Sequence, residues 1–170
     1  RIGDQLPAFS AEDAALLTNS MDYIAINYYT SEVVRHAAGR PPMDVEIVPQ
    51  PDRKHTEMNW PVRADGFHRL LHWLNDRYGG LPLYITENGA ACPDRPDKTG
   101  FVDDQDRIEY LRDHLGAVHQ AICEGVPVRG YFAWSLMDNL EWSMGYSKRF
   151  GLVRCDFDTQ RRTIKASGLW

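Results

Sequence analysis

Residues 81–89, Leu-Pro-Leu-Tyr-Ile-Thr-Glu-Asn-Gly, place a carboxylate directly after a short apolar run. Gly79-Gly80 precede the run and Gly89 follows it, and glycines commonly mark the ends of such elements. An apolar run of this length, without polar alternation, is typical of a strand covered on both faces. Residues 81–86 therefore predict a buried strand that ends at Glu87.

Two similar strands and two helices surround this one. Residues 22–29 and 128–134 are apolar runs of the same kind. Apolar residues at helical spacing predict helices over Asp65–Tyr78 and Gln105–Glu124, which lie between the strands. Alternation of strands and helices indicates an α/β fold with a parallel sheet. In such folds the chemistry lies beyond the carboxyl ends of the strands.

The remaining segments have weaker signals. Residues 12–19 predict a short helix, and Arg149–Asp158 suggest a short hairpin. Thr30–Asn59 is polar and rich in proline, so we expect a long loop with one strand at Val45–Val48. A loop of this length usually lines a site or forms a lid. Residues 164–170 indicate the start of a last helix.

Composition narrows the function classes. The 170 residues carry 19 Lys and Arg against 24 Asp and Glu, a formal charge of −5, with no basic run. We therefore expect no nucleic acid and no membrane as partner. Cys92, Cys123 and Cys155 are too scattered for a zinc knuckle or a disulfide framework, which indicates reduced thiols. With no export signal visible, we expect a cytoplasmic protein.

Candidate chemistry gathers where the predicted strands end. Glu87 is placed to act as a nucleophile or general base, although a structural acid at a strand–helix junction has the same position. Trp134, Glu141 and Trp142 follow the third strand, and Tyr29 and Phe150 can join them. Aromatic rings beside carboxylates and amides suit a carbohydrate. The alternative is that these aromatic side chains are part of the hydrophobic core and bind no ligand.

At these residues the sequence resembles glycoside hydrolase family 1, the family of retaining β-glucosidases. Three stretches carry the resemblance: Asp22-Tyr-Ile-Ala-Ile-Asn-Tyr-Tyr-Thr30, Tyr84-Ile-Thr-Glu-Asn-Gly89 and Trp134-Ser-Leu-Met-Asp-Asn-Leu-Glu-Trp-Ser-Met-Gly-Tyr-Ser-Lys-Arg-Phe-Gly151. They occur in the family's order with plausible spacing, and the resemblance extends over nearly the whole chain. The resemblance implies a (β/α)8 TIM barrel, of which this chain is similar to strands 6 to 8 with their helices.

The resemblance also implies roles for individual residues. Glu87 matches the nucleophile that forms the covalent glycosyl-enzyme, Tyr29 matches the tyrosine that hydrogen-bonds it, and Asn27 lies in the same subsite. The residues that match the sugar-binding positions are Trp134 as the platform under the sugar, Glu141 and Trp142 on its outer hydroxyls, and Phe150 as an aromatic lining that end.

The substrate class follows from one position. The resemblance also bears on phosphorylated substrates. Family members that act on 6-phosphorylated sugars typically have Ser in place of Glu141 and Tyr in place of Phe150, and they retain the lysine that matches Lys148. This chain has Glu141 and Phe150. A carboxylate repels a sugar phosphate, so we expect an unphosphorylated β-glucoside or a short β-linked oligosaccharide.

The resemblance leaves one catalytic group missing. Retaining hydrolysis needs a second carboxyl group as acid/base. The family carries it in a Thr-[Phe/Leu]-Asn-Glu-Pro element, and this sequence has no Asn-Glu-Pro. The remaining candidates do not follow a predicted strand end: Glu12, Glu32, Glu46, Glu57, Glu109 and Glu124. A full barrel takes about 250 residues, so we expect residues 1–170 to be the C-terminal part of a single barrel domain. The N-terminal half and most of the last helix then lie outside this sequence.

Three hypotheses remain open. The first is retaining hydrolysis with Glu87 as nucleophile and the acid/base outside this chain, which leaves this chain alone inactive. The second is a truncated, non-catalytic sugar-binding module, and the third is a half-barrel that is completed by a separate N-terminal half. No cofactor is implied. His68 and His72 have a spacing that zinc could use, but no third ligand is apparent, so we expect no metal site.

Overall fold

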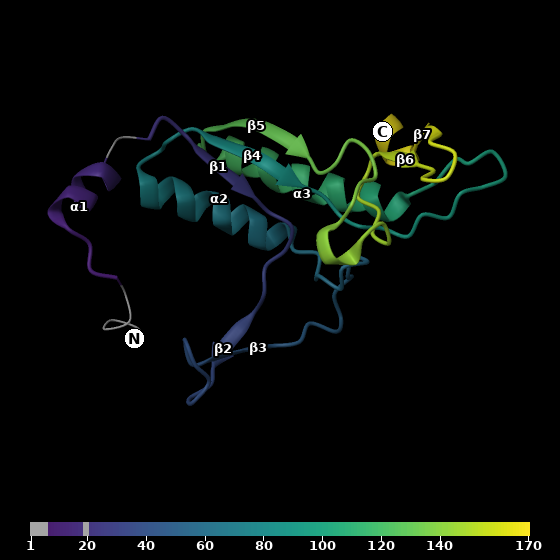
Figure 1. The fold of residues 1–170 in the computed structure, drawn as a ribbon. Helices are drawn as coiled ribbons and strands as arrows, with labels where there is room; N and C mark the ends of the chain where they lie inside the picture. Colours follow the sequence, from purple (N-terminus) through teal and green to yellow (C-terminus); the bar gives the residue numbers. More distant parts are fainter. Residues whose placement is uncertain (1–6, 19–20) are drawn as a thin grey trace.

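A three-stranded parallel sheet forms the centre of the molecule (Figure 1). The computed structural model describes residues 7–18 and 21–170. The sheet has the order β1 (Ile24–Asn27), β4 (Leu83–Asn88) and β5 (Val128–Ala133). The predicted α/β class and the parallel pairing are confirmed. All three strands therefore present their carboxyl ends at one edge of the sheet.

Two helices, α2 (Ala64–Tyr78) and α3 (Gln105–Cys123), pack on one face of this sheet. Gly79 ends α2 in the left-handed conformation, with φ of 68°, as the glycine pair predicts. The core between the helices and the sheet consists of Tyr28, Phe67, Leu71, Leu74, Leu83, Ile85, Val118, Ala121 and Val126. Burial of these side chains fixes which face of each strand points to the helices.

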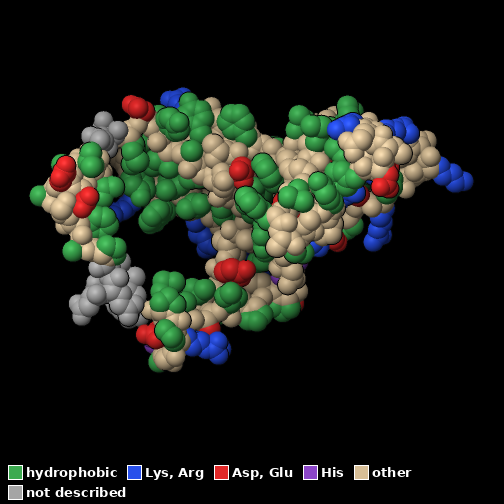
Figure 2. Space-filling model, viewed as in Figure 1, with side chains coloured by type: hydrophobic (Ala, Val, Ile, Leu, Met, Phe, Trp, Pro, Cys, Tyr) green, Lys and Arg blue, Asp and Glu red, His purple; other side chains and the backbone are tan. Residues whose placement is uncertain are grey.

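The other face of the sheet is not covered by the residues that the structure describes. Asn27 and Thr86 are exposed there, and Phe132 is 59% exposed. Figure 2 shows hydrophobic side chains gathered over the region of the sheet. A parallel sheet is normally covered on both faces, and here the described residues cover one of them.

The segment before α2 differs from the prediction. It contains two strands, β2 (Val34–His36) and β3 (Val45–Ile47), which form an antiparallel pair that projects from the body (Figure 1). We predicted only the second strand, because the three residues of β2 include Arg35 and His36 and lack an apolar run. The predicted helix at 12–19 is α1 (Ala11–Leu17), which has no buried residue, and the end of that prediction lies outside the described residues.

The C-terminal hairpin lies further along the chain than predicted. Its strands are β6 (Val153–Cys155) and β7 (Arg162–Ile164), so the predicted range of Arg149–Asp158 is wrong. Asp156 starts the turn between the strands, and its carboxylate accepts a hydrogen bond from the Thr159 amide. A short helix, α4 (Ala166–Leu169), follows. The last helix therefore begins where the sequence predicts.

A buried ion cluster fastens this hairpin to the body. Lys165 is completely buried, with Nζ 2.9 Å from Asp138 Oδ1 and 3.0 Å from Asp94 Oδ2. Asp138 also accepts hydrogen bonds from the backbone amides of Gly151 and Cys155. Burial raises the pKa of Asp94 in spite of the nearby Lys165 ammonium. Lys165 is thus shared by two buried carboxylates, while Arg149 lies 3.1 Å from Asp138 Oδ2 and Arg107 lies 4.0 Å from Asp94 Oδ1.

Two further expectations concern the thiols and the membrane. The three cysteines are free, with Cys92 and Cys155 buried and Cys123 exposed. In the described ranges, none of the helices has the length and apolar character that crossing a bilayer requires.

Candidate active site

Glu87 is the penultimate residue of β4, at the carboxyl edge of the sheet. Strict alternation would point Glu87 to the helices with Ile85, and Asn88 to the open face with Thr86. The register of β4 against β1 and against β5 slips between residues 85 and 88. Asn88 is consequently fully buried, and Glu87 is partly exposed at the edge. Such irregularities commonly re-aim side chains beside active sites.

Tyr29 holds the Glu87 carboxylate. Its phenol donates a hydrogen bond of 2.5 Å to Glu87 Oε2. Burial, followed by this hydrogen bond and the negative charge of Glu87, raises the pKa of Tyr29 far above its ordinary value. The phenol therefore stays protonated and remains a donor at neutral pH. The pairing that the resemblance implies for these two residues is present in the geometry.

Asn88 ties Glu87 to the neighbouring elements. Its amide nitrogen donates to the Tyr28 carbonyl at 2.7 Å and to the Tyr110 hydroxyl at 3.0 Å, and its oxygen accepts from the Tyr131 hydroxyl at 2.7 Å. The Tyr110 hydroxyl donates in turn to the Tyr29 carbonyl at 2.9 Å. This network fixes Tyr29 and Glu87 relative to each other. Sequence reasoning assigned no role to Tyr110 or Tyr131, although an amide at the end of a buried strand must find partners.

Trp134 follows β5 and lies next to the end of β4. Its amide donates to the Asn88 carbonyl at 2.9 Å. A Cβ at Gly89 would lie 1.8 Å from the Trp134 carbonyl oxygen, so only glycine permits this approach. Gly89 thus has a steric role in setting the position of Trp134 beside Glu87.

Glu141 adds a second carboxylate. The pKa of Glu141 is raised, mainly by burial and to a smaller extent by the negative charge of Glu87. The two carboxylates are therefore near enough for their charges to interact. Trp142 begins a short 3-10 helix, η2 (Trp142–Met144), and is 87% exposed in this chain. The ring is therefore free to contact a ligand.

Phe150 differs from its expected role. The resemblance implies that it lines the sugar site, but it is only 1% exposed. Its ring packs edge-on against Tyr29, with centroids 6.0 Å apart. Phe150 therefore supports Tyr29 from beneath and presents no surface to a ligand. Trp60, which sequence reasoning missed, packs near both rings, 5.7 Å from Tyr29 and 6.5 Å from Phe150.

Asn27 lies at the end of β1, opposite Glu87 in the sheet register. The side-chain oxygen of Asn27 accepts a 2.6 Å hydrogen bond from the Thr86 hydroxyl. Both residues are on the uncovered face. Asn27, Tyr29, Glu87 and Trp134 thus come from the ends of three different strands and lie at one edge, and Glu141 lies in the loop that follows the third strand.

Comparison with known proteins identifies the family. Residues 1–170 match the model of glycosyl hydrolase family 1. The chain belongs to this family. It is 45% identical over 174 residues to a bifunctional beta-D-glucosidase/beta-D-fucosidase of Bifidobacterium breve, covering 93% of this chain and 38% of that protein. It is 44% identical over 172 residues to a beta-glucosidase of Agrobacterium sp., covering 99% of this chain and 37% of that protein.

The fold agrees with the family. A beta-glucosidase from Thermotoga maritima, solved in complex with castanospermine, superposes with a TM-score of 0.92 at 41% identity. The match covers 99% of this chain and 38% of that chain. This α/β chain therefore corresponds to part of a family 1 barrel enzyme and spans less than two fifths of the length of these relatives.

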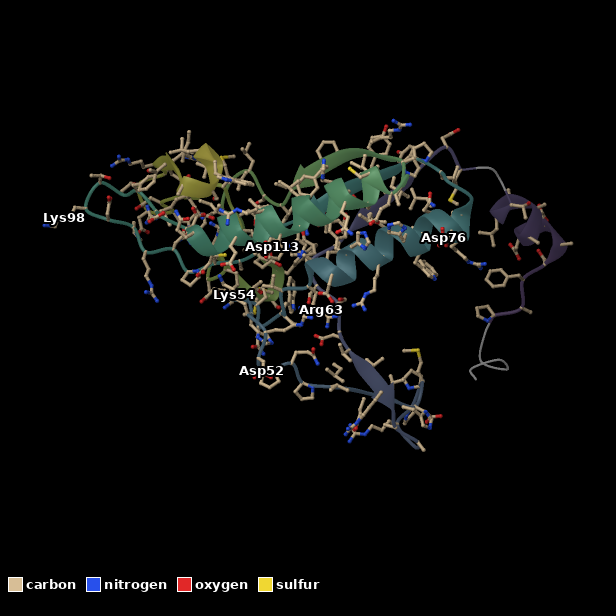
Figure 3. The ribbon with its side chains drawn as sticks, turned by 180° about the vertical axis from the view of Figure 1, so that it is seen from behind. Asp52, Lys54, Arg63, Asp76, Lys98 and Asp113 are labelled. Atoms are coloured by element: carbon tan, nitrogen blue, oxygen red, sulfur yellow. The ribbon has the colours of Figure 1, made fainter. Side chains whose placement is uncertain are left out.

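Three other glutamates of this family 1 chain lie outside β1, β4 and β5 and are paired with cations. Glu46 pairs with Arg35 in the β2–β3 hairpin, and Glu57 lies 3.7 Å from Lys148. Glu109, on α3, pairs with Lys54, which Figure 3 labels from behind. Of the described glutamates, Glu87 is the one that lies within β1, β4 or β5, and Glu141 lies in the loop that follows β5.

Removal of the Tyr29 hydroxyl should slow turnover by the polypeptide that contains this chain. Tyr29→Phe keeps the ring packing and deletes the 2.5 Å hydrogen bond to Glu87. A hydrogen bond to a charged group contributes about 1.5–3 kcal/mol, so kcat should fall by about 10- to 150-fold. Steady-state kinetics on an aryl β-glucoside measure this. Tyr78→Phe, at the exposed end of α2, is the matched control. Equal rates for the two variants would contradict the assigned role of Tyr29.

Proposed function

We propose that this chain forms the nucleophile-bearing part of a retaining β-glucosidase that hydrolyses unphosphorylated β-D-glucosides or related β-glycosides. Glu87 is the nucleophile. The observation that supports this most strongly is the Glu87 carboxylate at the end of β4, held at 2.5 Å by a protonated Tyr29. A rigid carboxylate with one oxygen fixed leaves the other oxygen free to attack.

The reaction has two displacements. In the first, a Glu87 oxygen forms a bond to the anomeric carbon, the glycosidic C–O bond breaks, and a carboxylic acid protonates the departing oxygen. In the second, the conjugate base of that acid takes a proton from water, which attacks the anomeric carbon and releases Glu87. Two inversions give net retention of the β configuration.

The sugar is held by the side chains around Glu87. Trp134 offers a flat surface to the apolar face of the ring, and Glu141 accepts hydrogen bonds from its outer hydroxyls. Trp142 and Asn27 contribute polar contacts from either side. Phe150 acts indirectly, because it packs beneath Tyr29.

The acid/base lies outside this sequence, in the remainder of the barrel. The chain carries strands 6 to 8 as β1, β4 and β5, and residues 1–170 are the C-terminal part of one barrel domain. The uncovered sheet face and the coverage of 37% to 38% of the relatives support this assignment. Activity consequently needs the complementary part of the barrel, whether that part is joined to this chain or supplied separately.

The experiment that tests the function is a stereochemical one. The complete polypeptide, or this chain co-expressed with the complementary part of a barrel, is given an aryl β-glucoside in an NMR tube. We expect the anomeric signal of β-glucose to appear first, with α-glucose following by mutarotation. First formation of α-glucose, or no hydrolysis by the complete protein, would contradict the proposal.

Glu141 should decide between plain and 6-phosphorylated sugars. Glu141→Ser removes a carboxylate whose charge opposes a phosphate, and such like-charge repulsion costs several kcal/mol. We expect the ratio of kcat/KM for a 6-phospho-β-glucoside over the plain β-glucoside to rise by about 100-fold. Glu109→Ser, which removes an exposed carboxylate on α3 that pairs with Lys54, is the control. An unchanged ratio in Glu141→Ser would contradict the assignment.

A further inference from the structure

Three side chains that the proposed function does not use converge between the two large helices. His68 and His72 lie four residues apart on α2, on the same face of that helix, and their ring centroids are 4.7 Å apart. Glu124 caps the end of α3. The Nε2 atoms of both histidines lie 2.6 Å from Glu124 Oε2. The sequence showed the histidine pair but not its third member, because Glu124 is 52 residues away from His72.

We propose that His68, His72 and Glu124 form a binding site for a zinc-class divalent transition metal ion. Two imidazole nitrogens and a carboxylate oxygen are ligands that such ions accept, with water completing the coordination. The site belongs to the outer face of the helices. It is separate from the strand-end site, because α3 ends just before the start of β5 whereas Glu87 lies at the opposite, carboxyl edge.

The distances fit a metal ion after a small movement. The three ligand atoms all lie within 4.8 Å of one another. Bonds of about 2.0–2.2 Å to a tetrahedral ion separate neighbouring ligand atoms by about 3.3 Å. The two nitrogen–oxygen pairs must therefore open from 2.6 Å, and a side-chain rotation suffices for this. The three side chains are 24%, 32% and 40% exposed, which leaves them room to rotate.

The surroundings prepare Glu124 as a ligand. Gln120 donates a 2.9 Å hydrogen bond to Glu124 Oε1, the oxygen that the histidines do not use. A supporting hydrogen bond to a ligating carboxylate is the usual outer partner in a metal site.

An open path leads to the site. A cavity of about 650 Å³ lies between α2 and α3, and its lining includes His68 and Gln120. Figure 3 shows these helices from behind, with Asp76 marking the last turn of α2 and Asp113 the middle of α3. A hydrated ion can reach the ligands through this groove. Once bound, the ion would join α2 to the end of α3 and act as a structural clamp.

The test is direct metal binding to the complete polypeptide that contains this chain. Equilibrium dialysis against Zn²⁺, with the metal counted by mass spectrometry, should give one ion that His68→Gln and His72→Gln each remove. Loss of an outer-shell partner alone weakens binding by about 10- to 100-fold. We therefore expect a loss of about 100-fold or more for each ligand variant and about 10-fold for Gln120→Ala.

The control is His119→Gln, which changes an exposed histidine on α3 outside the cluster. It should leave the ion count unchanged. Retained glycosidase activity shows that the ligand variants are folded, since the site is remote from Glu87. The unmutated protein gives a second readout, in which Co²⁺ should produce the visible absorption of a tetrahedral complex that Zn²⁺ displaces. No stoichiometric Zn²⁺, or equal binding by the unmutated protein and both ligand variants, would overturn the proposal.

Discussion

Glu87→Ala in the complete polypeptide should reduce turnover of an aryl β-glucoside by about 10⁴- to 10⁶-fold, the loss typical of removing a nucleophile. Azide should then restore product formation, because the shortened side chain leaves space beneath the anomeric carbon. With a leaving group that needs little protonation, azide attacks directly from the face that Glu87 occupied. A single displacement inverts the configuration, so NMR should identify the product as the α-glucosyl azide.

The stereochemistry of the azide product makes this experiment decisive. If Glu87 were the acid/base instead, a covalent intermediate would still form on another carboxylate, and azide would intercept it to give the β-glucosyl azide. Glu141→Ala is the matched control, because Glu141 shares the site and interacts with the Glu87 charge. It should lose activity without azide rescue. Near-normal turnover in Glu87→Ala, or a β-azide from it, would contradict the nucleophile assignment.

Lys165→Met should destabilise the folded state by about 3–5 kcal/mol, the cost of removing one member of a buried ion cluster. The Lys165 ammonium is completely buried between Asp138 and Asp94, whose side chains are 0% and 7% exposed. Methionine retains the volume but not the charge. Asp138 then keeps only the pair with Arg149, Asp94 keeps only the more distant Arg107, and the β6–β7 hairpin loses its buried contact with both carboxylates. Denaturant unfolding of the complete polypeptide measures the difference.

Lys54→Met provides the comparison for the buried lysine. Lys54 also contacts two carboxylates, at 2.7 Å and 2.6 Å from Asp106 and Glu109, but its side chain is 43% exposed. Exposed pairs contribute about 0–1 kcal/mol. The two lysines therefore make similar contacts in different surroundings. Equal losses of unfolding free energy in the two variants would contradict the prediction, because the buried Lys165 would then stabilise the fold no more than the exposed Lys54.

The sheet and the nucleophile candidate were predictable because short-range patterns determine them. Apolar runs and glycine ends define three strands, and parallel order follows from the helices between them. Glu87 follows one of these runs in the sequence. The direction of its side chain was not predictable, since it depends on the register slip between residues 85 and 88, which alternation alone does not contain.

The remaining site residues depend on contacts between distant parts of the chain. Tyr110 meets Asn88 across 22 residues and Tyr29 across 81, and neither contact leaves a mark in local periodicity. Asp138 lies inside a motif that we interpreted as sugar-binding, yet it serves the buried cluster with Lys165. Phe150 was expected at the sugar and lies in the core. Motifs thus predicted the candidate site, and tertiary contacts indicate which of its residues support the others.

The measurement we would make first identifies the residue that a slow substrate labels covalently. A 2-deoxy-2-fluoro-β-glucoside with a good leaving group reacts with a retaining nucleophile and leaves the covalent glycosyl-enzyme trapped. Proteolysis and mass spectrometry of the labelled complete polypeptide should find one fluoroglucosyl group on the peptide that contains Glu87, and fragmentation should place it on that residue. A label on any other residue, or no label on a protein that hydrolyses β-glucosides, would contradict Glu87 as the nucleophile.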